Sequence, residues 1–293
     1  MIKENIVSLV DGFTIELNPK VRHKLKSIPL DKKNNVYITY LPDATENDIL
    51  ETVDFVSKQE LTPITHLPAR TMRDLDHVSD FLKELRNRTD SKKILVIGGG
   101  GNQNGSVSSS LEILESGLLK DNEFEEIGIA GHPEGSPDID QNTVNEFLDK
   151  KYELSKNKNL SLELVTQFFF NAEPFIKWCK FLDNSNIKLP VRVGFPGPAS
   201  FKTLLNFGIM SGVGNSLSFL KKNSSKVTDL LTKTSNDEMF IELANFSKEQ
   251  SSFKNFHCFP FGGFEKTCHW LNALQNGDFT MENDKIVLHN KIF

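Results

Sequence analysis

Short apolar runs alternate along the chain with longer stretches in which apolar residues recur every three or four positions. The longer stretches have the spacing of amphipathic helices, and the short runs are typical of parallel strands that are buried on both faces. Eight such runs favour an α/β fold that closes into a (β/α)8 TIM barrel over an open, doubly wound sheet. The expected strands cover residues 13–17, 36–40, 63–67, 94–97, 127–130, 162–168, 191–194 and 256–261.

The segment between the seventh and eighth expected strands is long enough to hold extra helices. No linker rich in proline, glycine or serine divides the chain and no internal repeat is visible, so residues 1–293 are expected to form a single barrel domain. The polar tail from residue 276 onward is expected to be peripheral. Helices are predicted at residues 46–59, 73–86, 143–154, 173–182 and 200–207, with the extra helices at 217–232 and 237–247.

Composition narrows the class of protein. The formal net charge of −5 repels a phosphate backbone, so nucleic-acid binding is not expected as the main activity. Cys179, Cys258 and Cys268 match no zinc-site spacing and form no disulfide framework, so no metal is expected and a reducing compartment is favoured. No apolar run is long enough for a signal peptide or a membrane helix. We therefore expect a soluble, cytoplasmic protein that does not bind membranes.

Polar residues gather at the carboxyl ends of the predicted strands, where the active sites of β/α barrels lie. Glu16, near the end of the first strand, would hold its proton and act as a general acid if buried, or would be an ordinary surface glutamate at an exposed edge. His66, in the third strand, is either a core histidine or a site residue. Gln167 lies among apolar neighbours, and a ligand with an amide-like edge would supply the partners that a buried amide needs.

A run of four glycines, residues 98–101, follows the fourth expected strand. It is either a flexible loop or a loop whose backbone N–H groups approach a phosphate. The run lacks the G-x-G-x-x-G spacing, the following helix and the acidic residue of a Rossmann fingerprint. A dinucleotide site of the Rossmann type is therefore not predicted.

Two longer segments resemble the most specific stretches of the methylenetetrahydrofolate reductase family. IAGHPEGSPD at residues 129–138 is similar to the family's A-x-Y-P-E-x-H-P-E, and VTQFFFNAEPF at 165–175 is similar to its I-T-Q-F-F-F-D. Weaker matches keep the family's order and extend the resemblance over nearly the whole chain, as a divergent member. They are TIELNP at 14–19, VYITY at 36–40, THL at 65–67, FPGPASFK at 195–202 and NFHCFPF at 255–261.

The resemblance implies a flavin-dependent barrel of one-carbon metabolism, in which hydride passes from NAD(P)H to FAD and then to the methylene carbon of a bound folate. By similarity, Glu16 is the catalytic acid that protonates the folate nitrogen when the methylene bridge opens. Gln167 would hold the pterin edge, and Phe201 would pack against the substrate on the flavin face. A homo-oligomer is also implied, because the family often self-associates. The implied cofactor-binding residues are Thr39, His66, Gly98, Gly99, Gly100, Ala130, His132 and Lys151.

The chain departs from the family pattern at several positions. Gly98–Gly100 stand where the family has Arg-Gly-Asp, so an arginine that holds the cofactor and an aspartate near flavin and folate are missing. His132 replaces a tyrosine, Ser136 a histidine and Asn171 an aspartate. Removing one preorganised electrostatic group commonly costs ~10²–10³ in rate. Slow turnover, the oxidative direction, weak flavin binding or a related substrate are therefore alternatives within this family.

Two further hypotheses follow from the missing arginine and aspartate. The first is a folate-binding enzyme that lacks flavin and moves a one-carbon unit directly. The second is a non-catalytic folate-binding subunit that needs a partner chain. The sequence alone distinguishes neither these alternatives nor NADH from NADPH.

Overall fold

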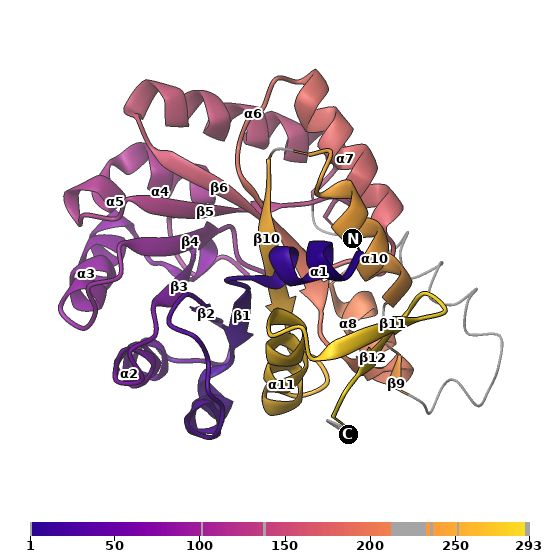
Figure 1. Cartoon of the computed structure of the whole chain (residues 1–293). Helices are drawn as coiled ribbons and strands as arrows, with labels where there is room; N and C mark the ends of the chain where they lie inside the picture. Colours follow the sequence, from indigo (N-terminus) through magenta and orange to yellow (C-terminus); the bar gives the residue numbers. More distant parts are fainter. Residues whose placement is uncertain are drawn as a thin grey trace.

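The computed structural model describes residues 2–100, 102–136, 139–211, 233–234, 237–250 and 252–290. Eight parallel strands close into a barrel in the order β1-β10-β7-β6-β5-β4-β3-β2, with helices around it (Figure 1). The TIM barrel predicted from the eight apolar runs is confirmed. The barrel strands are β1 (Thr14–Leu17), β2 (Asn35–Ile38), β3 (Pro63–Pro68), β4 (Lys93–Ile97), β5 (Glu126–Gly131), β6 (Ser161–Thr166), β7 (Val191–Pro196) and β10 (Phe253–Phe259).

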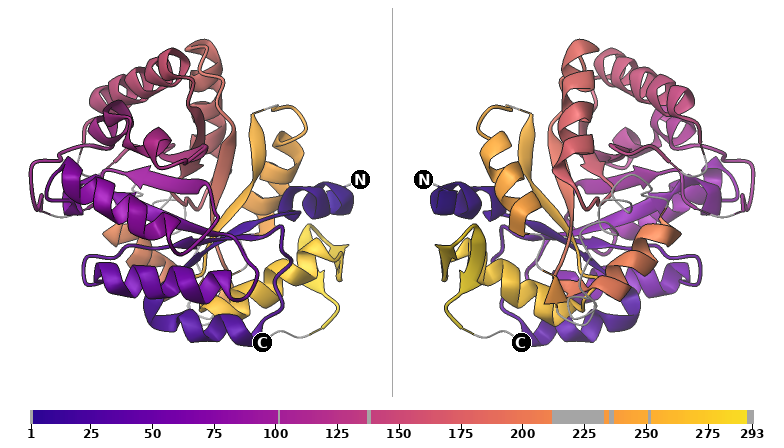
Figure 2. Two further views of the ribbon diagram at one scale, coloured as in Figure 1. Left: turned by 90° about the vertical axis from the view of Figure 1, so that its left-hand side faces the viewer. Right: turned by 90° about the vertical axis from the view of Figure 1, so that its right-hand side faces the viewer.

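Helices pack around the outside of the barrel and bury their apolar faces against the strands (Figure 2). Polar residues define where several of them begin: Thr45 and Asp48 form a capping box, and Asp140 accepts hydrogen bonds from two backbone N–H groups. The helices are α1 (Ile2–Val10), η1 (Pro19–Ser27), α2 (Glu46–Ser57), η2 (Ala69–Thr71), α3 (Leu75–Arg86), α4 (Ser110–Ser116), α5 (Leu118–Asp121), α6 (Gln141–Lys158), α7 (Ala172–Asn184), α8 (Phe201–Met210), α10 (Asp237–Phe246) and α11 (Phe264–Gln275).

The centre of the barrel is filled by side chains. Its apolar part is a buried cluster of Tyr37, Ile64, Leu95 and Val165, one residue from each of β2, β3, β4 and β6. Inward-pointing side chains of this kind make a TIM barrel a packed core instead of a pore. The pocket for a ligand must therefore lie at an end of the barrel or outside it.

A charged group lies beside this apolar cluster, near the amino ends of β6 and β7. Glu163 Oε1 accepts a hydrogen bond from Arg192 Nε at 2.7 Å, and its Oε2 contacts Lys254 Nζ at 2.7 Å. Burial alone would raise the pKa of Glu163, but the two cations, Arg192 foremost, hold it below its usual value. The Tyr37 hydroxyl lies 3.2 Å from Glu163 Oε1, and burial raises its pKa well above the ordinary value, so Tyr37 stays protonated.

The segment between β7 and β10 contains α8, which matches the helix predicted at residues 200–207, and α10, which confirms the extra helix expected at 237–247. A short strand pair, β8 (Ala199–Ser200) with β9 (Lys233–Thr234), also lies in this segment. The helix predicted at residues 217–232 falls outside the described residues.

The prediction of a merely peripheral tail was wrong. Residues 279–288 form an antiparallel hairpin of β11 (Phe279–Glu282) and β12 (Lys285–Leu288), and Phe279 is fully buried. Lys3 Nζ in α1 donates to the Phe279 carbonyl at 2.7 Å, so the first helix and the tail pack together (Figure 2). The tail thus completes the core on the side of the barrel where α1 lies.

Some strand ends also differ from prediction. The last strand was expected at residues 256–261, but β10 runs from Phe253 to Phe259, because Pro260 has no N–H and the Phe261 N–H turns back to the Phe259 carbonyl. The second strand ends at Ile38, two residues early. Within the described part of the chain, no helix is both long and apolar enough to cross a membrane.

Candidate functional site

Glu16 lies in β1 between two imidazole rings. Its Oε1 is 3.3 Å from Nε2 of His257 in β10 and 3.5 Å from Nε2 of His66 in β3. The Glu16 side chain is 15% exposed, so the carboxyl group is recessed but reachable. Since the barrel is closed and has no edge strand, the reading of Glu16 as an exposed edge glutamate was wrong.

His257 was not singled out from the sequence, and it is the best-anchored member of this cluster. Its side chain is fully buried, and its Nδ1 lies 2.8 Å from Thr14 Oγ1 in the adjacent strand. The nearest other acceptor for the Thr14 hydroxyl, the Phe256 carbonyl, is at 3.4 Å, so the shorter contact favours donation from Thr14 to Nδ1. That tautomer leaves Nε2–H to donate to Glu16. The signal in the sequence was a histidine within a strand of aromatic residues.

His66 occupies the other side of Glu16. It is 7% exposed, and burial lowers its pKa, an effect that the charge of Glu16 only partly offsets. His66 is therefore neutral near pH 7, and its Nε2 makes no geometrically sound hydrogen bond with the described residues. Tyr37 supports both rings edge-on, at 4.5 Å from His257 and 6.2 Å from His66 between ring centroids. The cluster thus rests on the packed centre of the barrel.

The loops after β3 and β4 are tied together beside this cluster. The Arg70 N–H donates to the Gly98 carbonyl at 2.9 Å, and the Asn104 N–H donates to the Arg70 carbonyl at 2.8 Å. The Ser106 N–H donates to the Arg73 carbonyl. Arg70 is half-buried, and its guanidinium makes no ion pair within the described ranges. These contacts hold the backbone of Arg70 against the glycine loop.

The glycines of this loop differ in whether a side chain would fit at their positions. Gly99 has φ +85°, and a Cβ there would lie 2.9 Å from Cβ of Pro68, so a side chain is excluded on both grounds. Gly98 and Gly100 have no atom within 4 Å of the place where a Cβ would stand. The missing arginine and aspartate of the family pattern thus leave open space, which no neighbouring described side chain fills. Gly101 lies outside the described residues.

A second basic group lies near the end of β5. Lys151 on α6 is half-buried, and burial lowers its pKa to about 8. It forms no ion pair with any residue that the structure describes. His132, directly after β5, has a pKa lowered to about 4 by burial and, secondarily, by the charge of Lys151, and its buried Nδ1 has no partner there. Ala130 is half-buried near the end of β5. These groups would suit an anionic ligand.

Two of the predicted ligand-binding residues, Thr39 and Gln167, already form hydrogen bonds within the protein. The Thr39 hydroxyl, just after β2, donates to the Leu17 carbonyl at 3.1 Å. The Gln167 side-chain Nε2, just after β6, donates to the Ser211 carbonyl at 2.9 Å, and no other hydrogen bond joins this amide group to the described residues. Both residues lie at the end of the barrel that carries Glu16, since all eight strands are parallel.

Phe201 begins α8 and is 7% exposed. It packs in an aromatic cluster with Phe168 and Phe170, and the rings of Phe259 and Phe261 extend this cluster to the end of β10. Phe201 thus contributes to an apolar wall after β6 and β7. The sequence comparison indicated Phe201 but not the surrounding cluster.

Comparison with known proteins supports the fold. No protein-family profile matches the chain. Among solved structures, an uncharacterised protein from Clostridium thermocellum, described as binding two copies of 5-methyl-5,6,7,8-tetrahydrofolic acid, aligns with a TM-score of 0.55. The alignment covers 94% of this chain and 98% of that chain, at 14% sequence identity. At this identity the likeness is evidence for a shared TIM-barrel fold.

Proposed function

We propose that this chain is a flavin-dependent oxidoreductase that interconverts 5,10-methylenetetrahydrofolate and 5-methyltetrahydrofolate, with NAD(P)H as hydride donor or acceptor. The observation that carries the proposal is the recessed Glu16 carboxyl group, held between His257 and His66 at the carboxyl end of the barrel. Its position and surroundings suit a proton donor for a ligand in the barrel mouth. Resemblance to the methylenetetrahydrofolate reductases supplies the reaction.

The described residues at the mouth fit a flavin dinucleotide. Lys151 and Arg70 are basic groups without carboxylate partners, and His132 presents an unpaired buried nitrogen. Lys151 and Arg70 would hold the diphosphate, and the open backbone at Gly98 and Gly100 would allow its close approach. When bound, the flavin would carry hydride between the nicotinamide and the folate.

The protein's own part in the reaction is to place and move a proton. Glu16 would donate its proton to the folate nitrogen as the methylene bridge opens, which makes the methylene carbon electrophilic. His257 would hold the carboxyl group in position through Nε2. The free N–H and oxygen of Gln167 would bind the donor–acceptor edge of the pterin, against the wall that contains Phe201.

Folate as the ligand class has independent support. The Clostridium thermocellum barrel, whose fold this chain shares over nearly its full length, is described as a binder of 5-methyltetrahydrofolate. We extend that ligand to this chain because its barrel mouth combines a carboxyl group, an amide and an aromatic wall.

An anaerobic titration tests the proposal. The purified protein should show flavin absorbance or acquire it when FAD is added, NAD(P)H should bleach it, and methylenetetrahydrofolate should restore it. Colourless protein that takes up no FAD would contradict the proposed cofactor, and bleaching without restoration by folate would contradict the proposed substrate.

A second candidate function rests on Gly98 and Gly100. Because no described side chain fills the space beside them, the mouth lacks the acidic and basic groups that the family uses there. A flavin-free folate-binding protein, catalytic in one-carbon transfer or not, fits this observation. Its signature would be saturable binding of 5-methyltetrahydrofolate together with no uptake of FAD.

A further inference from the structure

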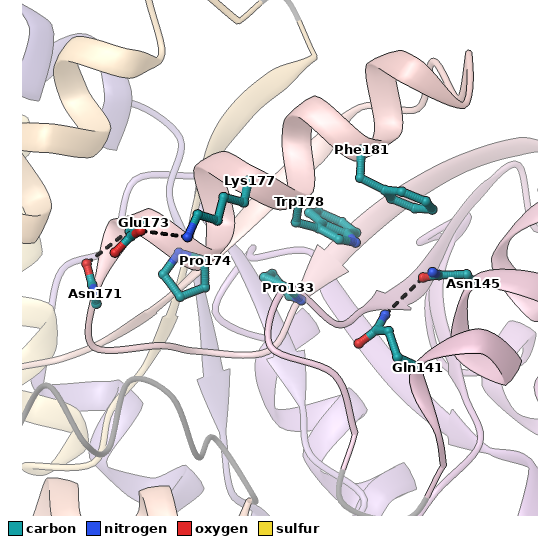
Figure 3. Close-up of a pocket in the computed structure, with 9 residues that line it drawn as sticks. All are labelled: Pro133, Gln141, Asn145, Asn171, Glu173, Pro174, Lys177, Trp178 and Phe181. Carbon is teal, nitrogen blue, oxygen red and sulfur yellow. Dashed lines mark hydrogen bonds and ion pairs between the residues drawn. The ribbon is translucent and has the colours of Figure 1, made fainter.

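A separate pocket opens on the outside of the barrel, between the amino-terminal half of α6 and helix α7 (Figure 3). Its volume is about 590 Å³, within the range of ~300–1,000 Å³ that is usual for small-molecule sites. None of the residues assigned above to the barrel mouth lines it. The two regions are connected in the sequence by Pro133, which lines the pocket and directly follows His132.

The aromatic wall of this pocket is rigid. Trp178 of α7 is 6% exposed, and its ring lies against β5, where a Cβ on Gly131 would come within 2.9 Å of the indole. Phe181, one turn further along α7, continues the wall. The indole Nε1–H of Trp178 donates to no acceptor in the described part of the chain. The wall therefore offers a ligand chiefly the aromatic faces of Trp178 and Phe181.

Amide side chains from both sides line the pocket: Gln141 and Asn145 on α6, and Asn171 at the start of α7. Gln141 Nε2 donates to Asn145 Oδ1 at 2.9 Å (Figure 3), and among the described residues the Asn145 amino group and the Gln141 side-chain carbonyl have no further partner. Asn171 Oδ1 accepts the Glu173 N–H as the cap of α7, and its amino group remains available. The pocket therefore presents both donors and acceptors beside two aromatic rings.

The charge at the rim does not favour an anion. Lys177 pairs with Glu173 at 2.6 Å, and both side chains are more than half exposed. The pair is close to neutral in sum and screened by water. Recognition must therefore come from ring contact and from hydrogen bonds to the amides.

We propose that the pocket between α6 and α7 is a second ligand site, which binds a fused nitrogen heterocycle of the purine or pterin class. The ring would pack against Trp178 and Phe181, and its edge of alternating donors and acceptors would bind the amides of Gln141 and Asn145. Asparagine and glutamine amides pair with such edges in both directions, and aromatic side chains provide the matching face. This site is independent of the flavin and folate roles proposed for the barrel mouth.

Isothermal titration calorimetry on the full chain tests the site with three probes: adenosine, 6-methylpterin and the single-ring control uridine. We expect saturable binding of adenosine or 6-methylpterin and none of uridine, and the probe that binds identifies the class. Asn145→Leu should weaken that binding about tenfold or more. The matched control is Asn142→Leu on the same helix, which is exposed and outside the pocket, and it should leave the affinity unchanged.

Three further variants distinguish loss of binding from loss of the fold. Trp178→Phe retains an aromatic ring but offers a smaller face, so affinity should fall while the fold, followed by circular dichroism, persists. If Asn145→Leu does not fold, Gln141→Leu takes its place. Trp178 is one of only two tryptophans in the chain, so Trp270→Phe makes its fluorescence a direct reporter of occupancy.

Three results would overturn the second site. The first is that no probe binds saturably at millimolar concentration. The second is that Asn142→Leu and Asn145→Leu lose the same amount of affinity. The third is that binding is lost in Gln167→Leu but kept in Asn145→Leu. The last would place the heterocycle in the barrel mouth. None of these measurements involves flavin or turnover, so failure of the proposed oxidoreductase activity would leave this test intact.

Discussion

Nε2 of His257 lies 3.3 Å from Oε1 of Glu16, and Nδ1 of the same ring is held at 2.8 Å by the Thr14 hydroxyl. The histidine is fully buried, whereas the carboxyl group it contacts is partly exposed. A buried, anchored imidazole beside a reachable carboxyl group is an arrangement that orients a proton donor. The functional predictions begin from this pair.

Glu16→Gln should separate the two half-reactions. The amide keeps the shape but has no acidic proton, so folate turnover should fall by ~10²–10⁴. Reduction of the flavin by NAD(P)H needs no proton from Glu16 and should be retained. Anaerobic stopped-flow absorbance measures both steps, and equal loss of both would show that Glu16 has another role.

His257→Asn should slow the folate half-reaction while leaving flavin reduction unchanged, because it removes the contact that orients Glu16. Thr14→Val is the matched test of anchoring, since it removes only the hydrogen bond to Nδ1. We expect a smaller loss, about tenfold, from Thr14→Val. The longer His257→Gln side chain can bring its amide N–H near the place of Nε2, so it should recover part of the rate, and a rate as low as that of His257→Asn would contradict an orienting role.

FAD affinity should depend on pH through Lys151. Burial lowers the pKa of this amine to about 8, so it is charged below that pH and loses its charge as the pH rises through it. If Lys151 holds the diphosphate, FAD should bind more weakly above about pH 8. Lys151→Met should bind FAD weakly at all pH values, without this dependence. Fluorescence titrations of FAD at pH 6.5 and 9 compare the two proteins.

Restoring the family's charged residues should raise activity. Gly98→Arg and Gly100→Asp enter open space, so the double variant should fold normally. It should bind FAD more tightly and turn over faster, by up to ~10²–10³ if the missing electrostatic groups limit the rate. Gly99→Ala is the contrasting control and should destabilise the loop, because φ is +85° there. An inactive but well-folded double variant would favour the flavin-free alternative.

The buried ion pair of Glu163 and Arg192 in the barrel centre should contribute to the stability of the fold and not to catalysis. Arg192→Met leaves Glu163 with only Lys254 as a cation, and breaking a buried pair costs ~3–5 kcal/mol. Because the pKa of Glu163 is held below its usual value in the folded protein, its contribution is present at neutral pH and is lost as the pH falls through that lowered pKa. Urea unfolding at pH 7 and pH 4 should therefore show a smaller difference between wild type and Arg192→Met at pH 4.

The barrel was predictable because its strands are buried on both faces, which makes each of the eight runs apolar almost throughout. Helix α1 and the hairpin β11–β12 were missed because the helix has only nine residues and each strand only four, too short for a clear periodic pattern. Phe279, fully buried, shows that even a polar-looking tail contributes to the core. Short segments of this kind acquire their structure from contacts with the rest of the molecule.

The site was predictable only in part. Glu16 and His66 were found because polar residues at strand ends stand out, and the structure brings them together. His257 was missed because its importance depends on the pairing of β1 with β10, which no local pattern records. The pocket beside Trp178 is lined by residues of α6 and α7 that are far apart in the sequence, and it has no motif of its own.

The pairing of β1 with β10 also has a consequence for the order of events during synthesis. Thr14 and His257 are 243 residues apart, so a growing chain exposes the carboxylate long before its imidazole partner exists. Until β10 docks, the sheet has two free edges and Glu16 lacks the neighbour that orients it. If Glu16 acts as proposed, activity would appear only when the ring closes, and its onset would time the final step of assembly.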